Sequence, residues 1–256
     1  MDVRTAAASL AVLVVFLAAW EWLPGLFGVP AFVLPPASQV WSEFLRMLST
    51  DRVLWHSGIT TMEVIVGFFL GSVLGMAIGY LLGVSPRAEV VLSPYILALQ
   101  IAPKVAFAPL FVMWLGFTVY PKILVAILIV FFPVMVNVLT AMRTVDPDMV
   151  NLARAFSASR WQIFRKIEYP ASLPPLFSGL RIGATLAVIG VVVGELVGGN
   201  LGLGYLLVMG GGQGNTAMVF VAILLLTVIG ILAYGAVILV ERRVLHYIPR
   251  ARFQTA

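Results

Sequence analysis

The sequence predicts an all-α integral membrane protein with about six transmembrane helices. Of its 256 residues, 61% are hydrophobic and only 11% are charged, and the mean hydropathy is +1.06. A soluble domain carries roughly 25% charged residues, so this chain lacks more than half of the charge that a water-facing surface needs. Apolar stretches of about 20 residues, the length that crosses a bilayer as a helix, recur along the chain. We therefore expect residues 1–256 to form one transmembrane domain.

The apolar stretches define the predicted spans. They cover about residues 6–27, 60–83, 89–117, 121–141, 176–198 and 216–240. The first follows Arg4 like the apolar core of a signal peptide, but no convincing small-residue cleavage site follows it, so we expect an uncleaved signal-anchor. The third contains Pro103 and Pro109, which predict a kink or two half-helices. Between the first two spans, Ser38–Trp55 mixes aromatic and charged residues in the manner of an interfacial amphipathic helix.

The basic residues predict the orientation of the chain. With the N-terminus inside, twelve Lys and Arg residues fall on inner segments and three on outer ones, while Lys104 lies within the third span. Cytoplasmic loops of membrane proteins carry the excess of positive charge. We therefore expect a multi-pass protein with both termini in the cytoplasm. The net charge of +5 does not indicate nucleic-acid binding, because the basic residues lie between spans and form no patch with interleaved aromatics.

The composition also excludes several kinds of site. The chain has no cysteine, which rules out disulfides, thiolate metal sites and cysteine nucleophiles. His56 and His246 are isolated, so we expect no metal site and no catalytic residue. No G-x-x-x-x-G-K-[ST] phosphate loop is present, and none of the lysines follows a glycine. If ATP drives this protein, another subunit binds the ATP.

Glycines recur every fourth residue along the second span. Gly67, Gly71, Gly75 and Gly79 share one helix face, and Gly83 continues it. Helices approach closely in lipid where side chains are absent, so this face predicts helix packing; a ligand groove is the alternative. The fifth span carries a similar set. Its members are Gly179, Gly183, Gly190, Gly194 and Gly198.

The longest polar stretch, residues 142–170, predicts two short helices joined by a turn. Asp146 and Pro147 are typical of a helix start. A break follows at Ser157–Ser159, and Ser159 with Gln162 has the spacing of a capping box. Exposed aromatic and arginine side chains on such a unit are typical of a protein-docking surface. The alternative is an amphipathic linker on the membrane surface.

The same stretch resembles the signature loop of ATP-binding-cassette importer permeases. That signature is Glu-Ala-Ala, three residues, Gly, nine residues, then Ile-x-Leu-Pro. Ala153, Ile167 and Pro170 match it in register. The departures are Asn151 for Glu, Leu152 for Ala, Ser157 for Gly and Tyr169 for Leu. Ser in the left-handed turn that Gly normally forms costs about 1 kcal/mol.

Further motifs over about residues 30–245 look like those of the nitrate/sulfonate/taurine-type permeases. They are Gln100–Phe111 (QIAPKVAFAPLF), Trp114–Phe117 (WLGF), Phe132–Pro133, Val192–Glu195 (VVGE) and Leu201–Tyr205 (LGLGY). The resemblance implies a type I importer permease bundle in a bacterial inner membrane. It further implies two permeases, as a homodimer or an unlike pair, together with two cytoplasmic ATPases that bind ATP and Mg²⁺ and an extracytoplasmic substrate-binding protein. The permease is then a transport subunit and not an enzyme, and it carries a small solute by alternating access. Members of this family carry nitrate, sulfonates, taurine, aromatic acids, or pyrimidine and flavin precursors.

The resemblance assigns ATPase docking to residues of the coupling loop. They are Asn151, Ala153, Arg154, Phe156, Ser157, Ser159, Arg160, Trp161 and Phe164. Candidates for the translocation pathway come from two sources. Charges within spans are costly, which singles out Glu63, Lys104 and Glu195, either in contact with solute or paired with one another. Gln100, Met113 and Trp114 are candidates by resemblance only.

Two other functions remain as alternatives. A stand-alone secondary transporter or channel predicts inverted repeats, usually more spans, and no docking loop. An integral-membrane enzyme predicts clustered His, Asp or Cys at a membrane face. The sequence meets neither expectation.

Overall fold

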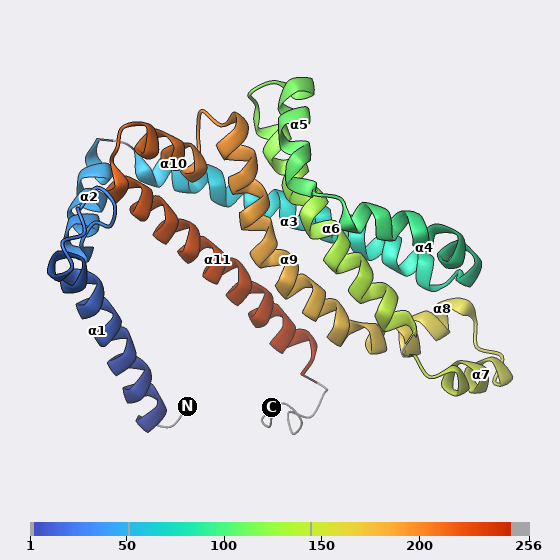
Figure 1. Cartoon of the computed structure of the whole chain (residues 1–256). Coiled ribbons are helices and arrows are strands. Elements are labelled where there is room, and N and C mark those ends of the chain that lie inside the picture. Colours follow the sequence, from blue (N-terminus) through green and yellow to red (C-terminus); the bar gives the residue numbers. More distant parts are fainter. Residues whose placement is uncertain (1–2, 51, 144, 247–256) are drawn as a thin grey trace. The chain divides into compact units, whose positions relative to one another are not determined.

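The computed structural model describes residues 3–50, 52–143 and 145–246, and within these ranges its regular structure is entirely helical (Figure 1). The longer helices are α1 (Val3–Leu26), α3 (Val53–Gly83), α4 (Pro86–Ile101), α6 (Val119–Arg143), α9 (Tyr169–Gly198) and α11 (Thr216–Val244). The shorter helices are α2 (Ala37–Ser49), η1 (Lys104–Phe107), α5 (Ala108–Leu115), α7 (Pro147–Ala155), α8 (Arg160–Ile163), η2 (Phe164–Glu168) and α10 (Leu203–Gly212).

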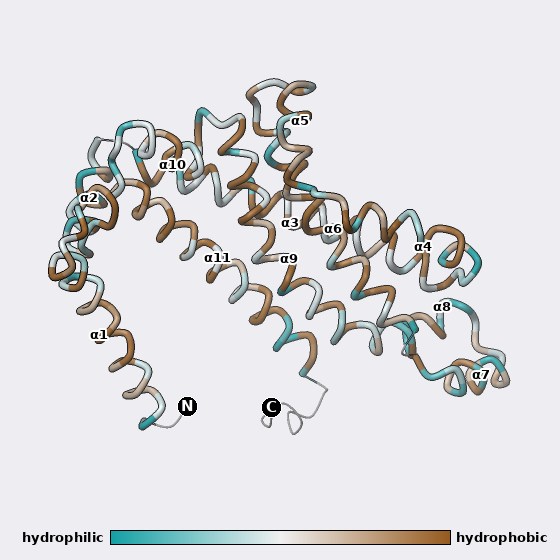
Figure 2. The backbone as a smooth tube through the Cα atoms, viewed as in Figure 1, coloured by the Kyte–Doolittle hydropathy of each residue, from teal (hydrophilic) through white to brown (hydrophobic). Residues whose placement is uncertain are grey.

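Five helices of the described chain are long and apolar enough to cross a membrane, and a bent pair makes a sixth candidate. Figure 2 shows hydrophobic residues along most of the length of α6 and α11. The bent pair is α4 with the η1–α5 segment, which turn by 79° at Ala102 and Pro103. Pro109 does not break α5, because it lies in the first turn, where a proline removes no helical hydrogen bond. The predicted division of the third span therefore lies at Pro103 and not at Pro109.

The fifth span is longer than the sequence predicts. The expected span covers 176–198, but a continuous helical stretch runs from Arg160 to Gly198. A π-helical turn over Phe164–Glu168 precedes Pro170, and the N–H of Tyr169 donates to the carbonyl of Phe164, five residues back. This wider turn makes room for a proline ring that clashes with the carbonyl four residues back in a regular α-helix. The helix therefore continues through Pro170 instead of ending there.

The amphipathic helix after the first span is shorter than expected. It is predicted over Ser38–Trp55, whereas α2 ends at Ser49 and Trp55 belongs to α3. Between the two helices Arg52 has a left-handed backbone with φ +49°. A residue in that conformation cannot continue a right-handed helix, so the chain turns before α3 begins.

Contacts between residues divide the chain into two units. One comprises the residues up to Thr60 together with Gly199–Thr227, and the other comprises Thr61–Gly198 together with the residues from Val228 onward. The boundaries fall inside α3, at the end of α9 and inside α11. A single transmembrane domain over the whole chain remains a prediction.

In the first unit, two side chains of α3 hold the backbone that leads into α10. The N–H of Gly202 donates to Nδ1 of His56 at 3.0 Å, and the N–H of Leu203 donates to Oγ1 of Thr60 at 2.8 Å. Both side chains are buried. These bonds satisfy backbone donors at a helix start, where no carbonyl of the helix itself is available.

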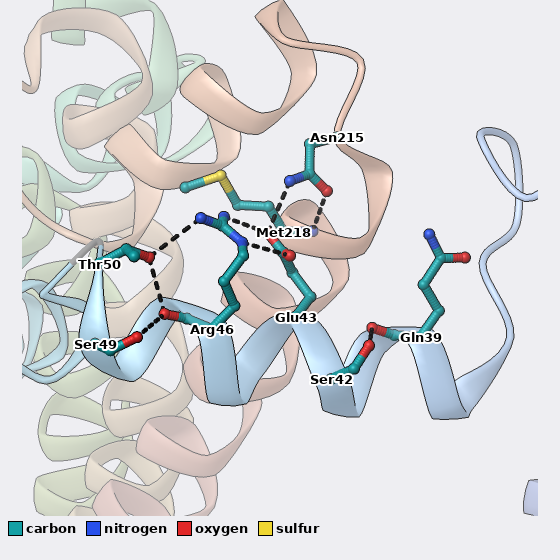
Figure 3. A network of polar contacts seen from close by, with 8 residues as sticks. All are labelled: Gln39, Ser42, Glu43, Arg46, Ser49, Thr50, Asn215 and Met218. Atoms are coloured by element: carbon teal, nitrogen blue, oxygen red, sulfur yellow. Dashed lines mark hydrogen bonds and ion pairs between the residues drawn. The ribbon is translucent and has the colours of Figure 1, made fainter.

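A second polar network in this unit joins α2 to the start of α11 (Figure 3). The Glu43 carboxylate accepts hydrogen bonds from Arg46, at 2.6 and 2.8 Å, and from the Asn215 amide at 2.7 Å. Asn215 in turn accepts a hydrogen bond from the N–H of Met218 at 3.1 Å, which caps α11. These bonds keep the pKa of Glu43 below its ordinary value of 4.5, with the Arg46 hydrogen bond as the main cause.

In the second unit, α6 lies between the glycine faces of α3 and α9. A Cβ atom placed on Gly67 would approach Cβ of Ala126 to 2.5 Å, and one placed on Gly190 would approach Cα of the same alanine to 2.7 Å. About one turn further along α6, Val130 lies against Gly71 of α3 and Gly183 of α9. The remaining glycines of the two faces also meet neighbouring atoms. Gly75, Gly79 and Gly83 lie against Phe131, Met135 and Met142, and Gly179 and Gly194 lie against Asn137 and Lys122.

This packing predicts an unequal response to added methyl groups. Gly75→Ala places Cβ 2.7 Å from the carbonyl oxygen of Phe131, and only a shift of the α6 backbone relieves that contact. We expect a loss of roughly 1–3 kcal/mol of stability, as in other overpacked cores. Gly235→Ala is the matched control, because no atom lies within 4 Å of the added Cβ. Thermal melts in detergent measure both, and equal melting temperatures for the two variants would contradict the packing.

The Glu43 network predicts a stability that depends on pH. The folded state lowers the pKa of Glu43 below 4.5. The ionised carboxylate therefore contributes its full stabilisation above pH 4.5, and this stabilisation is lost as the pH falls through the pKa of the folded state. Glu43→Gln removes the charge. The melting temperature of the variant should therefore lie below that of the wild type at neutral pH and approach it in acid. A difference that stays constant from neutral pH to about pH 3 would contradict this account.

Candidate functional site

The segment between α6 and α9 begins with a capped helix. The Asp146 carboxylate accepts a hydrogen bond from the N–H of Asp148 at 2.9 Å, and Pro147 occupies the first helical position of α7. Asp148 adds negative charge to the first turn, where the helix dipole favours it. The helix start expected from the sequence at these residues is confirmed.

A left-handed turn at Ser157 ends α7. The N–H of Ser157 donates to the carbonyl of Arg154 at 2.8 Å, and the N–H of Ala158 donates to the carbonyl of Ala153 at 3.0 Å. This pair of bonds is a Schellman motif, in which the left-handed position is usually glycine. Ser157 adopts it with φ +57°. The turn that Gly forms in the family signature is therefore present here with Ser in its place.

The second short helix begins with the expected capping box. Oγ of Ser159 accepts from the N–H of Gln162 at 3.2 Å, and Oε1 of Gln162 accepts from the N–H of Ser159 at 2.7 Å. The Schellman motif ends with Ala158, and the capping box begins at the next residue, Ser159. The turn between α7 and α8 therefore has little freedom, because hydrogen bonds fix the backbone on both sides of it.

Apolar side chains on this segment divide into an exposed set and an anchoring set. Phe156 is 79% exposed and Trp161 is 65% exposed. Phe164, in contrast, is half-buried, with its ring centroid 5.0 Å from that of Tyr80 on α3 and 5.4 Å from that of Trp161. Ile163 is buried beside it. Phe164 thus attaches the segment to α3.

The other residues assigned to docking lie mostly at the surface. Ala153 is half-buried. The exposed ones are Asn151, Arg154, Ser157, Ser159 and Arg160. The structure therefore presents Phe156 and Trp161 among polar and basic side chains on a segment of defined conformation.

Three charged residues of the second unit lie together in its interior. Nζ of Lys122 on α6 is 2.9 Å from Oε1 of Glu63 on α3. Glu195 on α9 is buried, and the residue before it, Gly194, packs against Lys122. Gly194 allows α9 to lie this close to α6, because a Cβ atom at Gly194 would lie only 2.6 Å from Cα of Lys122. Glu63 and Glu195 are both 0% exposed, so no solute reaches either carboxylate in this structure.

The sequence did not single out Lys122 as a partner of these acids. It lies at the predicted start of a span, beside Pro121, and is counted there among the outer loop residues. One feature of the sequence points to such a partner: Glu63 and Glu195 lie within spans that contain no basic residue at a comparable depth, so a base from another helix is needed to balance them. Of the two ways in which Glu63 can act, pairing or solute contact, the structure shows a pair, with Lys122 in place of Lys104.

Lys104 lies at the break between α4 and α5. Its Nζ is 4.8 Å from the centre of the Phe132 ring and donates to the carbonyl of Gln100. Among the described residues, no carboxylate lies within 4.0 Å of it. Gln100, Met113 and Trp114 are exposed, and Lys104 is partly so. These four candidates remain accessible to a solute.

The chain has recognisable relatives. The family described as "Binding-protein-dependent transport system inner membrane component" matches residues 67–246, which is more than half of the sequence. The chain belongs to this family. It is 36% identical over 231 residues to the riboflavin transport system permease protein RibX of Chloroflexus aurantiacus, covering 90% of this chain and 86% of the relative. It is 35% identical over 233 residues to the putative aliphatic sulfonates transport permease protein SsuC of Bacillus subtilis, covering 91% and 84%.

The fold also has a solved counterpart. A chain of the MetNI methionine ABC transporter, crystallised in inward-facing conformations, superposes with a TM-score of 0.63 and 22% identity. The match covers 75% of this chain and 95% of that one. The expected all-helical importer-permease fold is confirmed, as is the resemblance to permeases named for sulfonate, taurine and nitrate transport.

The α7–α8 turn predicts opposite effects for two serines. Ser157→Gly removes the left-handed strain and should stabilise the turn by up to about 1 kcal/mol. Ser159→Ala removes the side-chain cap of α8 and should destabilise it by about 1 kcal/mol. Amide hydrogen exchange of peptides spanning 147–163 measures both against the wild type. Faster exchange in Ser157→Gly would contradict the assignment of strain to that residue.

Proposed function

We propose that this chain is the membrane-spanning permease of an ATP-driven, binding-protein-dependent importer, and that a separate ATPase docks on its α7–α8 segment. The observation that carries the proposal is the exposure of Phe156 and Trp161 on a conformationally fixed turn of a permease-family chain. Aromatic and arginine side chains are the usual centre of a protein interface. On a segment that holds its shape before binding, little further ordering opposes association.

The helical path from this segment supports a coupling role. Trp161 belongs to the stretch Arg160–Gly198, which is helical without interruption. Its α9 portion packs against α6 over the glycine face. A displacement of α8 by a partner therefore moves α9 as well, since a helix transmits force along its axis better than a loop does. Closure of the ATPases around ATP and Mg²⁺ supplies that displacement and switches the permease between two accessible states.

The ATP and its Mg²⁺ belong to the partner in this proposal. Sequence supports this, because the chain has no phosphate loop to hold a nucleotide. The permease contributes no chemistry of its own and is not an enzyme. It needs no cofactor to provide a path for solute.

Charge supports a cytoplasmic position for the docking segment. Arg143, Arg154, Arg160, Arg165 and Lys166 all fall on it or at its edge. With both termini on the same side, the positive-inside rule is satisfied for the whole chain. The opposite side then faces a substrate-binding protein that delivers the solute. A second permease completes the pathway, either a copy of this chain or a paired homologue.

The accessible pathway candidates favour a small anionic or heteroaromatic solute. Lys104 is the only basic residue among them, and it lies where α4 gives way to α5. Trp114 adds a flat aromatic surface nearby in sequence. The names of the relatives, which refer to riboflavin and aliphatic sulfonates, suit such a solute.

Substitution of the exposed aromatics tests the docking proposal. Phe156→Ala should weaken association with the cognate ATPase by about 30-fold, the effect of a 2 kcal/mol hot spot. Phe156 is the cleaner target, because Trp161 also contacts Phe164. Trp41→Ala is the control: that side chain is 62% exposed but lies on α2. Pull-down of the purified permease with the ATPase measures the effect, and unchanged association of Phe156→Ala and Trp161→Ala would refute docking at this segment.

A further inference from the structure

A cavity of about 400 Å³ lies beside α7, where several spans of the second unit end. Gly83 is the last residue of α3, and a Cβ atom placed on it would approach Cβ of Met142, near the end of α6, to 2.6 Å. The lining comes from this meeting point, from the turn between α3 and α4, from α7 and from the α8–η2 segment. Ligand sites in proteins commonly have volumes of roughly 300–1,000 Å³, so the cavity is large enough to hold a small molecule or a headgroup.

The cavity lies outside the hydrocarbon core of the membrane. The helical stretch Arg160–Gly198 has 39 residues, which is about 58 Å at 1.5 Å per residue. The hydrocarbon core is only about 30 Å thick, so a stretch of this length protrudes from it. Four of the six charged residues of the stretch lie within its first nine positions, which identifies the protruding end. Arg160 and Glu168, which line the cavity, both belong to that end.

The basic side of the cavity is formed by α7 and the start of α8. Pro147, Asn151 and Arg154 line it at positions i, i+4 and i+7, which share one face of a helix. Arg160 adds a second guanidinium group. No carboxylate of the described residues lies within 4.0 Å of either arginine. Two unpaired guanidinium groups beside an amide are suitable partners for a phosphate.

An acidic side chain lines the same cavity. Glu168 is only 9% exposed. Within the described parts of the chain it has neither an ion pair nor a hydrogen bond. Arg143, which follows the cavity-lining Met142, is paired with Glu89 on α4 instead. A buried acid without a partner is unfavourable, so the position favours a ligand group that is a cation and a hydrogen-bond donor.

The cavity therefore suits a ligand that carries both signs of charge. An anionic group fits the two arginines, and an ammonium group fits the acid. Other lining side chains are apolar, among them Val84, Val145 and Val150, and they suit a hydrocarbon part. A phospholipid with an ethanolamine headgroup has all three parts, namely an ammonium group, a phosphate and a glycerol with acyl chains.

We propose that this cavity binds the phosphoethanolamine headgroup of a membrane lipid, with the phosphate on Arg154 and Arg160 and the ammonium group on Glu168. A free zwitterion offers the same charges, but the apolar lining and the position at the ends of the spans favour a lipid. Phe156 and Trp161 do not line the cavity. A lipid here and a protein on those aromatics use different side chains of the segment, so the inference does not depend on the proposed ATPase docking.

Lipid titration of the purified full-length chain, followed by native mass spectrometry, tests the site. Phosphatidylethanolamine should bind the wild type about tenfold more tightly than phosphatidylglycerol with the same acyl chains, because only the first lipid offers Glu168 a charged donor. Glu168→Gln should abolish this preference. Arg154→Gln and Arg160→Gln should weaken the binding of both lipids, because both lipids carry the phosphate.

Arg165→Gln is the matched control. Arg165 is an exposed base of the same segment but does not line the cavity, so this variant should bind both lipids like the wild type. Equal affinity of the wild type for the two lipids would overturn the proposal, and this comparison requires no variant to fold. An equal loss of binding in Arg165→Gln and Arg154→Gln would also overturn it, because that result indicates attraction by surface charge alone.

Soluble phosphoethanolamine distinguishes a lipid site from a site for a free zwitterion. It has the same charged groups but no acyl chains, so it should bind the wild type at least about tenfold more weakly than the lipid. Equal affinity would overturn the assignment to a lipid.

Amide hydrogen exchange of peptides spanning 147–155 gives an independent readout. Phosphatidylethanolamine should slow the exchange of α7 in the wild type and in Arg165→Gln, but not in Arg154→Gln. Exchange without lipid shows whether a variant has unfolded α7. Exchange of the wild type that phosphatidylethanolamine leaves unchanged would contradict binding beside this helix.

Discussion

The close approach of α6 to two glycine faces is the contact on which the second unit depends. Lipid offers no hydrophobic drive for helices to associate, so their attraction comes from van der Waals contact at short range. Ala126 meets Gly67 on one side and Gly190 on the other, and neither neighbour has space for a methyl group. The three helices are thereby fixed in register as well as in distance. The pairing of Lys122 on α6 with Glu63 on α3 relies on that register.

The docking segment draws its rigidity from this packing. Phe164 attaches it to α3 through Tyr80, and the helix that starts at Arg160 leads directly into the part of α9 that packs on α6. The π-helical turn before Pro170 preserves this continuity where a proline would otherwise interrupt it. A local irregularity of the backbone therefore maintains a long-range mechanical connection between the exposed aromatics and the core.

Charge is distributed in two contrasting ways across the spans. Lys104 is partly exposed at a break between helices, where a solute can approach it. Glu63 and Lys122 form a buried ion pair, and Glu195 is fully buried as well. The same physical cost of charge in an apolar medium thus gives a candidate pathway residue in one place and a buried ion pair in the other. Accessibility, rather than residue type, distinguishes the two roles.

The sequence by itself determined the features that depend on near neighbours in the chain. Helical spans, the caps at Asp146 and Ser159 and the four-residue glycine period are all local, because hydrophobicity, capping and helix faces operate within a few residues. Only the tertiary structure decided that Lys122 pairs with Glu63, 59 residues away, and that Phe164 anchors the segment instead of joining the exposed set. Those outcomes depend on which helices pack together and in what axial register. The glycine spacing of one helix does not specify which helix packs against its glycine face.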